Sequence, residues 1–329
     1  MEDQNEAQKK LKFAFYWAAS CGGCEIAVLD INEKILDVVA NAEIVFWPVA
    51  MDIKYKDVDA MPDNSIDVCF FNGSIRTEEQ EHMAKLMRRK SKLLIAFGTC
   101  AHLGGVPGLA NLSNKKEIFE KAYLQSPSTK NPNGVVPKTA VEVEEGKLTL
   151  PEFYDIVRTL DQTVKVDYYV PGCPPHPNLI LKAVEAIVKN ELPASGSVLA
   201  PEKSVCDECK REKKEKGISR IYRVHEITLD PEKCFLEQGV LCMGPATRGG
   251  CEARCINANM PCTGCGGPCP GEMEQGAPMI SAISSILGLD EEKAETYDIE
   301  KLIGQIKDPI GTFYFYSLPA SILRRRIMK

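Results

Sequence analysis

The sequence predicts an α/β fold, with a doubly wound parallel sheet followed by a cysteine-rich irregular domain that bound metal organises. Segments of strand composition alternate with segments of helical periodicity in the first part of the chain, which is typical of a parallel sheet covered by helices. From about residue 195 this periodicity nearly vanishes, and nine of the fourteen cysteines follow. We therefore expect two domains, residues 1–195 and 196–329.

The elements of the first domain follow from composition and spacing. Five segments are rich enough in apolar and aromatic residues to be buried strands: 12–20, 42–50, 66–74, 92–100 and 166–173. Three segments have helical spacing of apolar residues or a helix start signal: 25–40, 77–90 and 178–192. Thr77 and Gln80 form a capping box for the second of these helices. A long, loop-rich excursion separates the fourth and fifth strands.

The second domain begins after a linker at residues 192–198, LPASGSV. Proline and glycine recur throughout the segment that follows, so regular structure cannot supply its order, and metal ligation can. The charge run KREKKEK at 210–216 is expected to be a solvated loop or helix face.

Composition limits the function. The net charge of -6 argues against nucleic-acid binding, which needs a basic surface. The N-terminal segment has no secretory signal, and no apolar run is long enough to cross a bilayer. We therefore expect a soluble, cytoplasmic protein without a membrane span. Structural disulfides are rare in that compartment, so fourteen cysteines indicate metal binding.

Four cysteines follow the ends of predicted strands. Cys21 and Cys24 come after the first strand, Cys100 after the fourth and Cys173 after the fifth. The carboxyl ends of parallel strands share one edge of a sheet, so these thiols are expected to converge there. Four converging thiolates suit either a tetrahedral zinc ion or an iron–sulfur cluster. Cys69 lies inside a strand pattern and is expected to be a small core residue.

Spacing favours iron–sulfur chemistry over its competitors. A thioredoxin-like redox pair would leave Cys100 and Cys173 unexplained. A zinc ribbon needs two CxxC pairs about 15–20 residues apart, whereas Cys206 and Cys209 are followed by single cysteines. The bacterial ferredoxin run is also absent. Cysteine-only ligation at many separate places favours iron–sulfur clusters, with structural zinc as the alternative.

The motifs SCGGCE, GTCAHLGG, PGCPPHP, LCMGPATRGGCEARC and PCTGCGGP, in this order, resemble the small subunit of nickel–iron hydrogenases. The resemblance covers nearly the whole chain. It is strongest to the cytoplasmic, methyl-viologen-reducing and deazaflavin-non-reducing group of methanogens and related archaea, which works with heterodisulfide reductase. It implies a flavodoxin-like first domain and an oxidoreductase subunit whose hydrogen-activating site lies on a partner chain.

The resemblance also implies three 4Fe-4S clusters that relay electrons from the large subunit. The ligands are then, for the proximal cluster, Cys21, Cys24, Cys100 and Cys173, for the medial cluster Cys251, Cys255, Cys262 and Cys265, and for the distal cluster Cys206, Cys209, Cys234 and Cys242. Many relatives have a histidine in place of Cys206, and many lack a counterpart of Cys255. Cys269 is left without a role. The implied partners are the large subunit, an electron-accepting iron–sulfur subunit and heterodisulfide reductase.

Other residues near these cysteines have two interpretations each. Glu25 is either an ordinary acid in the first turn of a helix or a group that assists proton movement. His102 and His176 either face a cluster sulfur or the large subunit, or are simply packed. Arg248 either orders the loop between two clusters or is solvated.

Three hypotheses for function remain at this point. The first is the electron-transfer subunit, with no catalytic residue on this chain. The second is the related quinone-reductase subunit of respiratory complex I, whose cluster loop has adjacent cysteines and which lacks this tail. The third is a zinc-stabilised binding scaffold. A self-sufficient enzyme is disfavoured because the sequence has no GxSxG motif, no P-loop and no further CxxC pairs for nickel.

Overall fold

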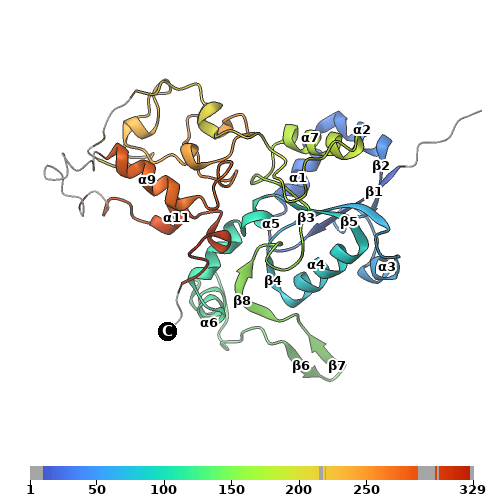
Figure 1. Cartoon of the computed structure of the whole chain (residues 1–329). Coiled ribbons are helices and arrows are strands. Elements are labelled where there is room, and N and C mark those ends of the chain that lie inside the picture. The colour runs from blue at the N-terminus through green and yellow to red at the C-terminus, as the bar shows by residue number, and fades with distance from the viewer. Residues whose placement is uncertain (1–9, 215–217, 219, 288–300, 302–303, 327–329) are drawn as a thin grey trace, which may run out of the picture.

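The computed structural model describes residues 10–214, 218, 220–287, 301 and 304–326. A five-stranded, fully parallel sheet forms the centre of the first domain (Figure 1). Its strands are β1 (Leu11–Trp17), β2 (Ala42–Phe46), β3 (Ile66–Asn72), β5 (Ser91–Phe97) and β9 (Tyr168–Val170). Their spatial order, β2-β1-β3-β5-β9, is the flavodoxin-like order. The predicted α/β fold class is confirmed.

Helices cover both faces of this sheet because alternate side chains of each strand point to opposite sides. Phe13 and Phe15 of β1 belong to the core under α1 (Gly23–Leu29), α2 (Ile35–Asn41) and α7 (Pro177–Val188). Ala14 and Tyr16 belong to the core under α4 (Glu78–Lys90) and α3 (Tyr55–Ala60). Cys69 is fully buried in this second core, as predicted.

Two local predictions can be compared directly with the structure. The capping box is confirmed: the Gln80 N–H donates to Thr77 Oγ1 (3.3 Å) and the Thr77 N–H donates to Gln80 Oε1 (3.1 Å). The single helix at 25–40 is wrong. α1 ends at Leu29, a 3₁₀ turn covers Asn32–Lys34, and α2 follows. Asn32 has a left-handed φ of 55°, which asparagine tolerates better than most residues and which interrupts a helix.

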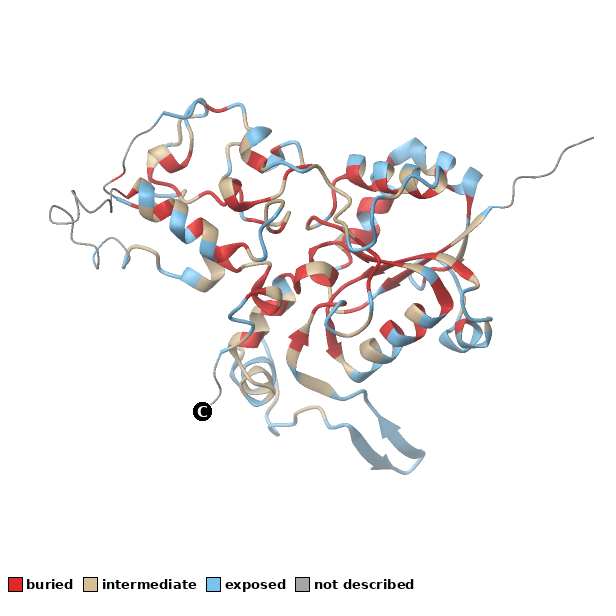
Figure 2. Ribbon diagram, in the orientation of Figure 1, coloured by how far each residue is buried: buried red, intermediate tan, exposed pale blue. Residues whose placement is uncertain are grey.

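The excursion between β5 and β9 has structure of its own. It contains α5 (Thr99–Leu103), a 3₁₀ helix (Val106–Leu112), α6 (Lys115–Phe119), a π-helical turn (Glu120–Gln125) and β8 (Phe153–Arg158). β8 pairs antiparallel with β4 (Ile75–Thr77). The hairpin of β6 (Ala140–Val143) and β7 (Gly146–Thr149) projects from the body and is exposed along its whole length (Figure 2).

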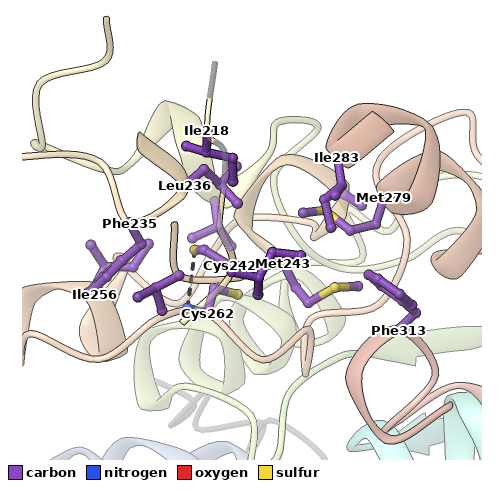
Figure 3. Close-up of a cluster of buried hydrophobic side chains, with 14 of the residues drawn as sticks. Ile218, Phe235, Leu236, Cys242, Met243, Ile256, Cys262, Met279, Ile283 and Phe313 are labelled. Atoms are coloured by element: carbon purple, nitrogen blue, oxygen red, sulfur yellow. Dashed lines mark hydrogen bonds between the residues drawn. The ribbon is translucent and has the colours of Figure 1, made fainter. Parts of the chain in front are cut away.

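The cysteine-rich domain consists mostly of short turns around its own apolar core. Its regular elements are 3₁₀ helices at Val205–Asp207, Leu236–Gln238, Gly244–Ala246 and Leu318–Ala320, and the helices α8 (Arg254–Asn257), α9 (Gly276–Ile286) and α11 (Pro309–Phe313). Figure 3 shows Cys242 and Cys262 side by side within this core, with Met279 and Ile283 of α9 nearby. Two cysteines of this domain are therefore shielded by apolar side chains.

The C-terminal part of the described chain packs back onto the first domain. Its carbonyl at Tyr316 accepts from the Gly105 N–H (2.9 Å). Pro319 lies so close to Gly104 that a Cβ there would be 2.2 Å from the proline ring. Arg326 pairs with Glu117 of α6 (2.7 Å). Within the described residues, no helix is both long and apolar enough to cross a membrane.

Candidate iron–sulfur cluster sites

The first group of thiols lies at the carboxyl edge of the sheet. Cys24 is on α1, Cys100 is on α5, and Cys21 and Cys173 are in the loops after β1 and β9. Burial raises the pKa of Cys24, and the thiols of Cys100, Cys173 and Cys21 raise it further. Three separate segments thus bring four thiols into one neighbourhood.

Glycines make room for these sulfur atoms. A Cβ on Gly98 would lie 2.3 Å from the Sγ of Cys24, and one on Gly105 would lie 2.5 Å from the Sγ of Cys100. Both glycines also have positive φ, 84° and 60°, which other residues rarely adopt. The turns before and after α5, the helix that carries Cys100, therefore need glycine.

Thr99 ties the loops of this group together. Its N–H donates to the Gly172 carbonyl (2.9 Å), and its hydroxyl oxygen accepts from the Gly172 N–H (3.2 Å). The same hydroxyl donates to the carbonyl of Cys265 in the other domain (2.6 Å). Thr99, which the sequence does not single out, thus fixes Cys173 relative to Cys100 and links both to the cysteine-rich domain.

A second group of thiols is formed by Cys206, Cys209, Cys234 and Cys242. Burial raises the pKa of Cys206 to about 12, Lys213 opposes this increase, and the other three thiols add to it. The Lys213 ammonium also donates to the Cys206 carbonyl (2.6 Å). Gly244 lies against this group, since a Cβ there would be 3.2 Å from the Cys206 Sγ.

The third group of thiols lies between the first two and consists of Cys251, Cys255, Cys262 and Cys265. Burial raises the pKa of Cys265 to about 12, with further contributions from the thiols of Cys251, Cys173 and Cys255, while a hydrogen bond from the Cys173 N–H lowers it. Burial raises the pKa of Cys262, and the thiol contributions come from Cys242 and then Cys265. The Cys262 N–H donates to the Cys242 Sγ (3.3 Å), the dashed line in Figure 3.

The three groups therefore form a continuous series. Cys173 and Cys265 join the first group to the third, and Tyr316 lies beside that junction, where burial and the thiols of Cys265, Cys173 and Cys255 raise its pKa to about 12. Cys242 and Cys262 join the third group to the second. The sequence contained no signal for Tyr316.

Cys269 stands apart from this series. Its thiol donates to the Pro245 carbonyl (3.3 Å). Burial raises its pKa, and the charged groups that modify this effect are Arg248, Glu272 and Asp207. All fourteen cysteines lie in the described part of the chain. No other cysteine thiol is among the groups that affect the pKa of Cys269.

Four residues near the cysteines had two interpretations each from the sequence, and all four are at least partly buried: Glu25, His102, His176 and Arg248. Glu25 is in the first turn of α1 but only 4% exposed, and it accepts hydrogen bonds from the Trp47 indole and the Asn72 amide; its burial raises its pKa. The His102 ring packs on Tyr169, with centroids 4.6 Å apart. His176 caps α7, its Nδ1 accepting from the Asn178 N–H (3.2 Å).

Arg248 has fixed contacts rather than a free solvated side chain. Its N–H donates to the Gly267 carbonyl (2.9 Å), and its guanidinium donates to the Pro201 carbonyl (3.4 Å). No three or more histidine, cysteine, aspartate or glutamate side chains among the described residues are placed to hold a single metal ion. The ligands of an iron–sulfur cluster surround several irons, so they are spaced more widely than the ligands of one ion.

Comparison with known proteins assigns the family. Residues 21–187 match the family of the NADH ubiquinone oxidoreductase 20 kDa subunit. The iron–sulfur subunit of the F420-non-reducing hydrogenase of Archaeoglobus profundus is 45% identical over 97% of this chain and 99% of its own length. The chain belongs to the iron–sulfur subunits of hydrogenases. The corresponding F420-non-reducing hydrogenase subunit of Methanothermobacter thermautotrophicus is 39% identical over 98% of both chains.

This membership confirms the hydrogenase resemblance. As a hydrogenase small subunit, the chain is part of an oxidoreductase and serves electron transfer. The quinone-reductase family matches residues 21–187 alone, whereas the hydrogenase relatives also cover the cysteine-rich domain. The reduced Ni-Fe-Se hydrogenase structure from Desulfomicrobium baculatum matches 85% of this chain and 99% of its own, at 20% identity and a TM-score of 0.47.

Proposed function

We propose that the chain relays electrons from hydrogen oxidation in a nickel–iron large subunit through three 4Fe-4S clusters. The proposed ligands are Cys21, Cys24, Cys100 and Cys173 (proximal), Cys251, Cys255, Cys262 and Cys265 (medial), and Cys206, Cys209, Cys234 and Cys242 (distal). The observation that carries this proposal is the continuous series of three thiol groups, joined at Cys173–Cys265 and at Cys262–Cys242.

The residues present fit such clusters. The donors are thiols alone, which suit iron–sulfur chemistry, and Gly98 and Gly105 keep side chains out of the space beside two of them. Burial disfavours the free thiolates of Cys24 and Cys100, so bound metal must compensate for the charge of these ligands. When bound, the clusters would accept and release electrons one at a time. Thr99 would hold the proximal and medial ligand loops at a fixed separation.

The large subunit is proposed to dock at the edge that carries Cys21. This thiol is exposed, and Ile26 and Leu29 on one face of α1 are 58% and 55% exposed. Trp17, whose ring lies against Gly22, adds a further exposed apolar surface. Apolar side chains that remain exposed together mark protein interfaces. A nickel–iron centre on the partner would then lie next to the proximal group.

At the other end of the series, the distal group is proposed to pass electrons to an iron–sulfur subunit and on to heterodisulfide reductase, in the cytoplasm. The exposed Lys213 lies beside this group, where its ammonium donates to the Cys206 carbonyl (2.6 Å), whereas Lys214 pairs with Glu212 (3.0 Å).

Anaerobic purification of the native complex tests the proposal. Three four-iron clusters predict about twelve iron and about twelve acid-labile sulfide per chain. The co-eluting chains should include a nickel-containing large subunit, and dithionite should bleach the brown colour. Stoichiometric zinc with little iron, or a chain that purifies without a large subunit, would refute this function.

A further inference from the structure

Arg211 is a buried cation in the cysteine-rich domain. It follows Cys209 by two residues and is 8% exposed, whereas Lys210, Glu212, Lys213 and Lys214 around it are exposed. The prediction that the whole run 210–216 is solvated is therefore wrong at this position; residues 215–217 lie outside the described residues.

The guanidinium of Arg211 holds two cysteine loops. Its Nη1 donates to the carbonyls of Asp230 and Lys233, both at 2.8 Å, and Lys233 immediately precedes Cys234. Its Nη2 donates to the Ile256 carbonyl (3.4 Å) and to Asn259 Oδ1 (2.6 Å). Ile256 immediately follows Cys255. One rigid, planar group thus fixes the backbone beside one cysteine of the second thiol group and one of the third.

The charge of Arg211 is not neutralised by a direct ion pair within the described chain. Its four acceptors are neutral carbonyl and amide oxygens. The carboxylate of Asp230 is near enough for Arg211 to contribute to the lowering of its pKa, but this carboxylate pairs with Lys233 (2.8 Å), which is the larger cause. The carboxylate of Asp230 is therefore already matched by another cation.

One face of the guanidinium lies against an aromatic ring. It packs on the ring of Phe235 at 3.9 Å, and Phe235 is 1% exposed. Figure 3 shows Phe235 next to Ile256, on the side of the core that holds Cys242 and Cys262. The positive charge thus lies against the core that encloses two of the thiols.

A buried positive charge is costly unless a negative group compensates for it. Four thiolates around an iron–sulfur cluster supply negative charge, and this charge increases when the cluster is reduced. Arg211 reaches the backbone beside Cys234 and beside Cys255, so a cluster held by either thiol group would lie near its charge.

We propose that Arg211 is a positioning residue that aligns Cys234 and Cys255 and raises the reduction potentials of the distal and medial clusters. This inference rests on the proposed cluster assignment. A nearby cation stabilises the more negative, reduced state of a cluster, so loss of the charge should make reduction harder. The hydrogen bonds act separately, since they orient the loops that carry the ligands.

The test uses the anaerobically purified complex with Arg211→Gln, Arg211→Lys and Arg220→Gln. Arg220 is the control because it is an exposed arginine of the same domain that packs over Tyr222 (4.6 Å). Iron content is measured first, and the potentials of all three clusters are then determined by redox titration followed by paramagnetic resonance. In Arg211→Gln the oxidised-to-reduced ratio of the medial and distal clusters should rise at least tenfold at a fixed potential, which equals about 59 mV for one electron.

The other variants separate charge from hydrogen bonding. Arg211→Lys keeps the charge, so its potentials should stay near those of the parent complex, although its point-like ammonium cannot replace the fork of hydrogen bonds and some iron should be lost. The proximal potential and all values in Arg220→Gln should not change.

Arg211→Gln with full iron and parent-like potentials would overturn the inference. If Arg211→Gln cannot retain iron, its iron content is compared with that of Arg211→Lys. Greater iron retention in Arg211→Lys supports the role of the charge. Equal iron loss in both variants refutes the role of the charge. Failure of the cluster assignment would be recognised separately, because the parent complex itself would then lack three clusters.

Discussion

Gly98→Ala should remove the proposed proximal cluster and leave the other two proposed clusters in place. The added Cβ would lie 2.3 Å from the Cys24 Sγ, so the sulfur would have to move by about 1 Å to reach ordinary van der Waals distance. Functional sites tolerate displacements of only about 0.5 Å, so Cys24 should no longer serve as a ligand. We expect the iron content to fall by about four per chain, from about twelve to about eight.

The matched control is Gly196→Ala. Gly196 has a φ of 94°, close to the 84° of Gly98, but a Cβ there would meet no atom within 4 Å. Both variants place an alanine at positive φ, which costs on the order of 1–3 kcal/mol. Gly98 also has a ψ of 163°, in a region that is essentially restricted to glycine, and only Gly98→Ala adds the clash with sulfur. Iron analysis and melting temperature should be measured for both. Full iron in Gly98→Ala, or equal iron loss in the two variants, would refute the reasoning.

Two further predictions concern the third thiol group and a surface charge network. Cys255→Ala should convert the proposed medial cluster to a three-iron form, visible by paramagnetic resonance. Cys269→Ala should leave the spectrum unchanged, because the Cys269 thiol donates a hydrogen bond to the Pro245 carbonyl instead. The reverse result would exchange the roles of the two cysteines. Hydrogen bonds from Lys85 and Arg158 lower the pKa of Glu81 to about 2, so its stabilising effect is complete above its ordinary pKa of 4.5 and is lost as the pH falls towards 2. Glu81→Gln should therefore reduce the unfolding free energy at pH 7 by about 1 kcal/mol after allowance for solvent screening, and most of this reduction should be gone at pH 2. Glu43→Gln, at an exposed position on β2, is the control for the melting curves.

The convergence of the first thiol group could be predicted from the sequence because it follows from topology. Parallel strands end at a common edge, so cysteines placed after β1, β5 and β9 must meet once the strands are recognised. The break between α1 and α2 could not be predicted from the sequence in this way. Apolar spacing continues through residues 25–40, and only the backbone conformation of Asn32 shows that the helix stops.

The cysteine-rich domain resisted prediction for a different reason. The structure of this domain depends on contacts between residues that are far apart in the sequence, and the local pattern of apolar residues does not indicate such contacts. Arg211 resembles its exposed neighbours in sequence, yet its hydrogen-bond acceptors lie 19 to 48 residues further along the chain. Three of these four acceptors are backbone carbonyls, which every sequence offers equally, so no pattern could identify them in advance.

The return of the chain's last described segment to the first domain has a consequence for biosynthesis. The carbonyl of Tyr316 and the ring of Pro319 cover the loop that follows Cys100, and Tyr316 borders the thiols of Cys265 and Cys173. Every cysteine precedes these residues in the sequence. A chain made from its N-terminus therefore contains all its cysteines before the segment that closes over the first junction exists. Insertion of the proposed clusters before this segment folds would leave the Cys173–Cys265 junction open on that side.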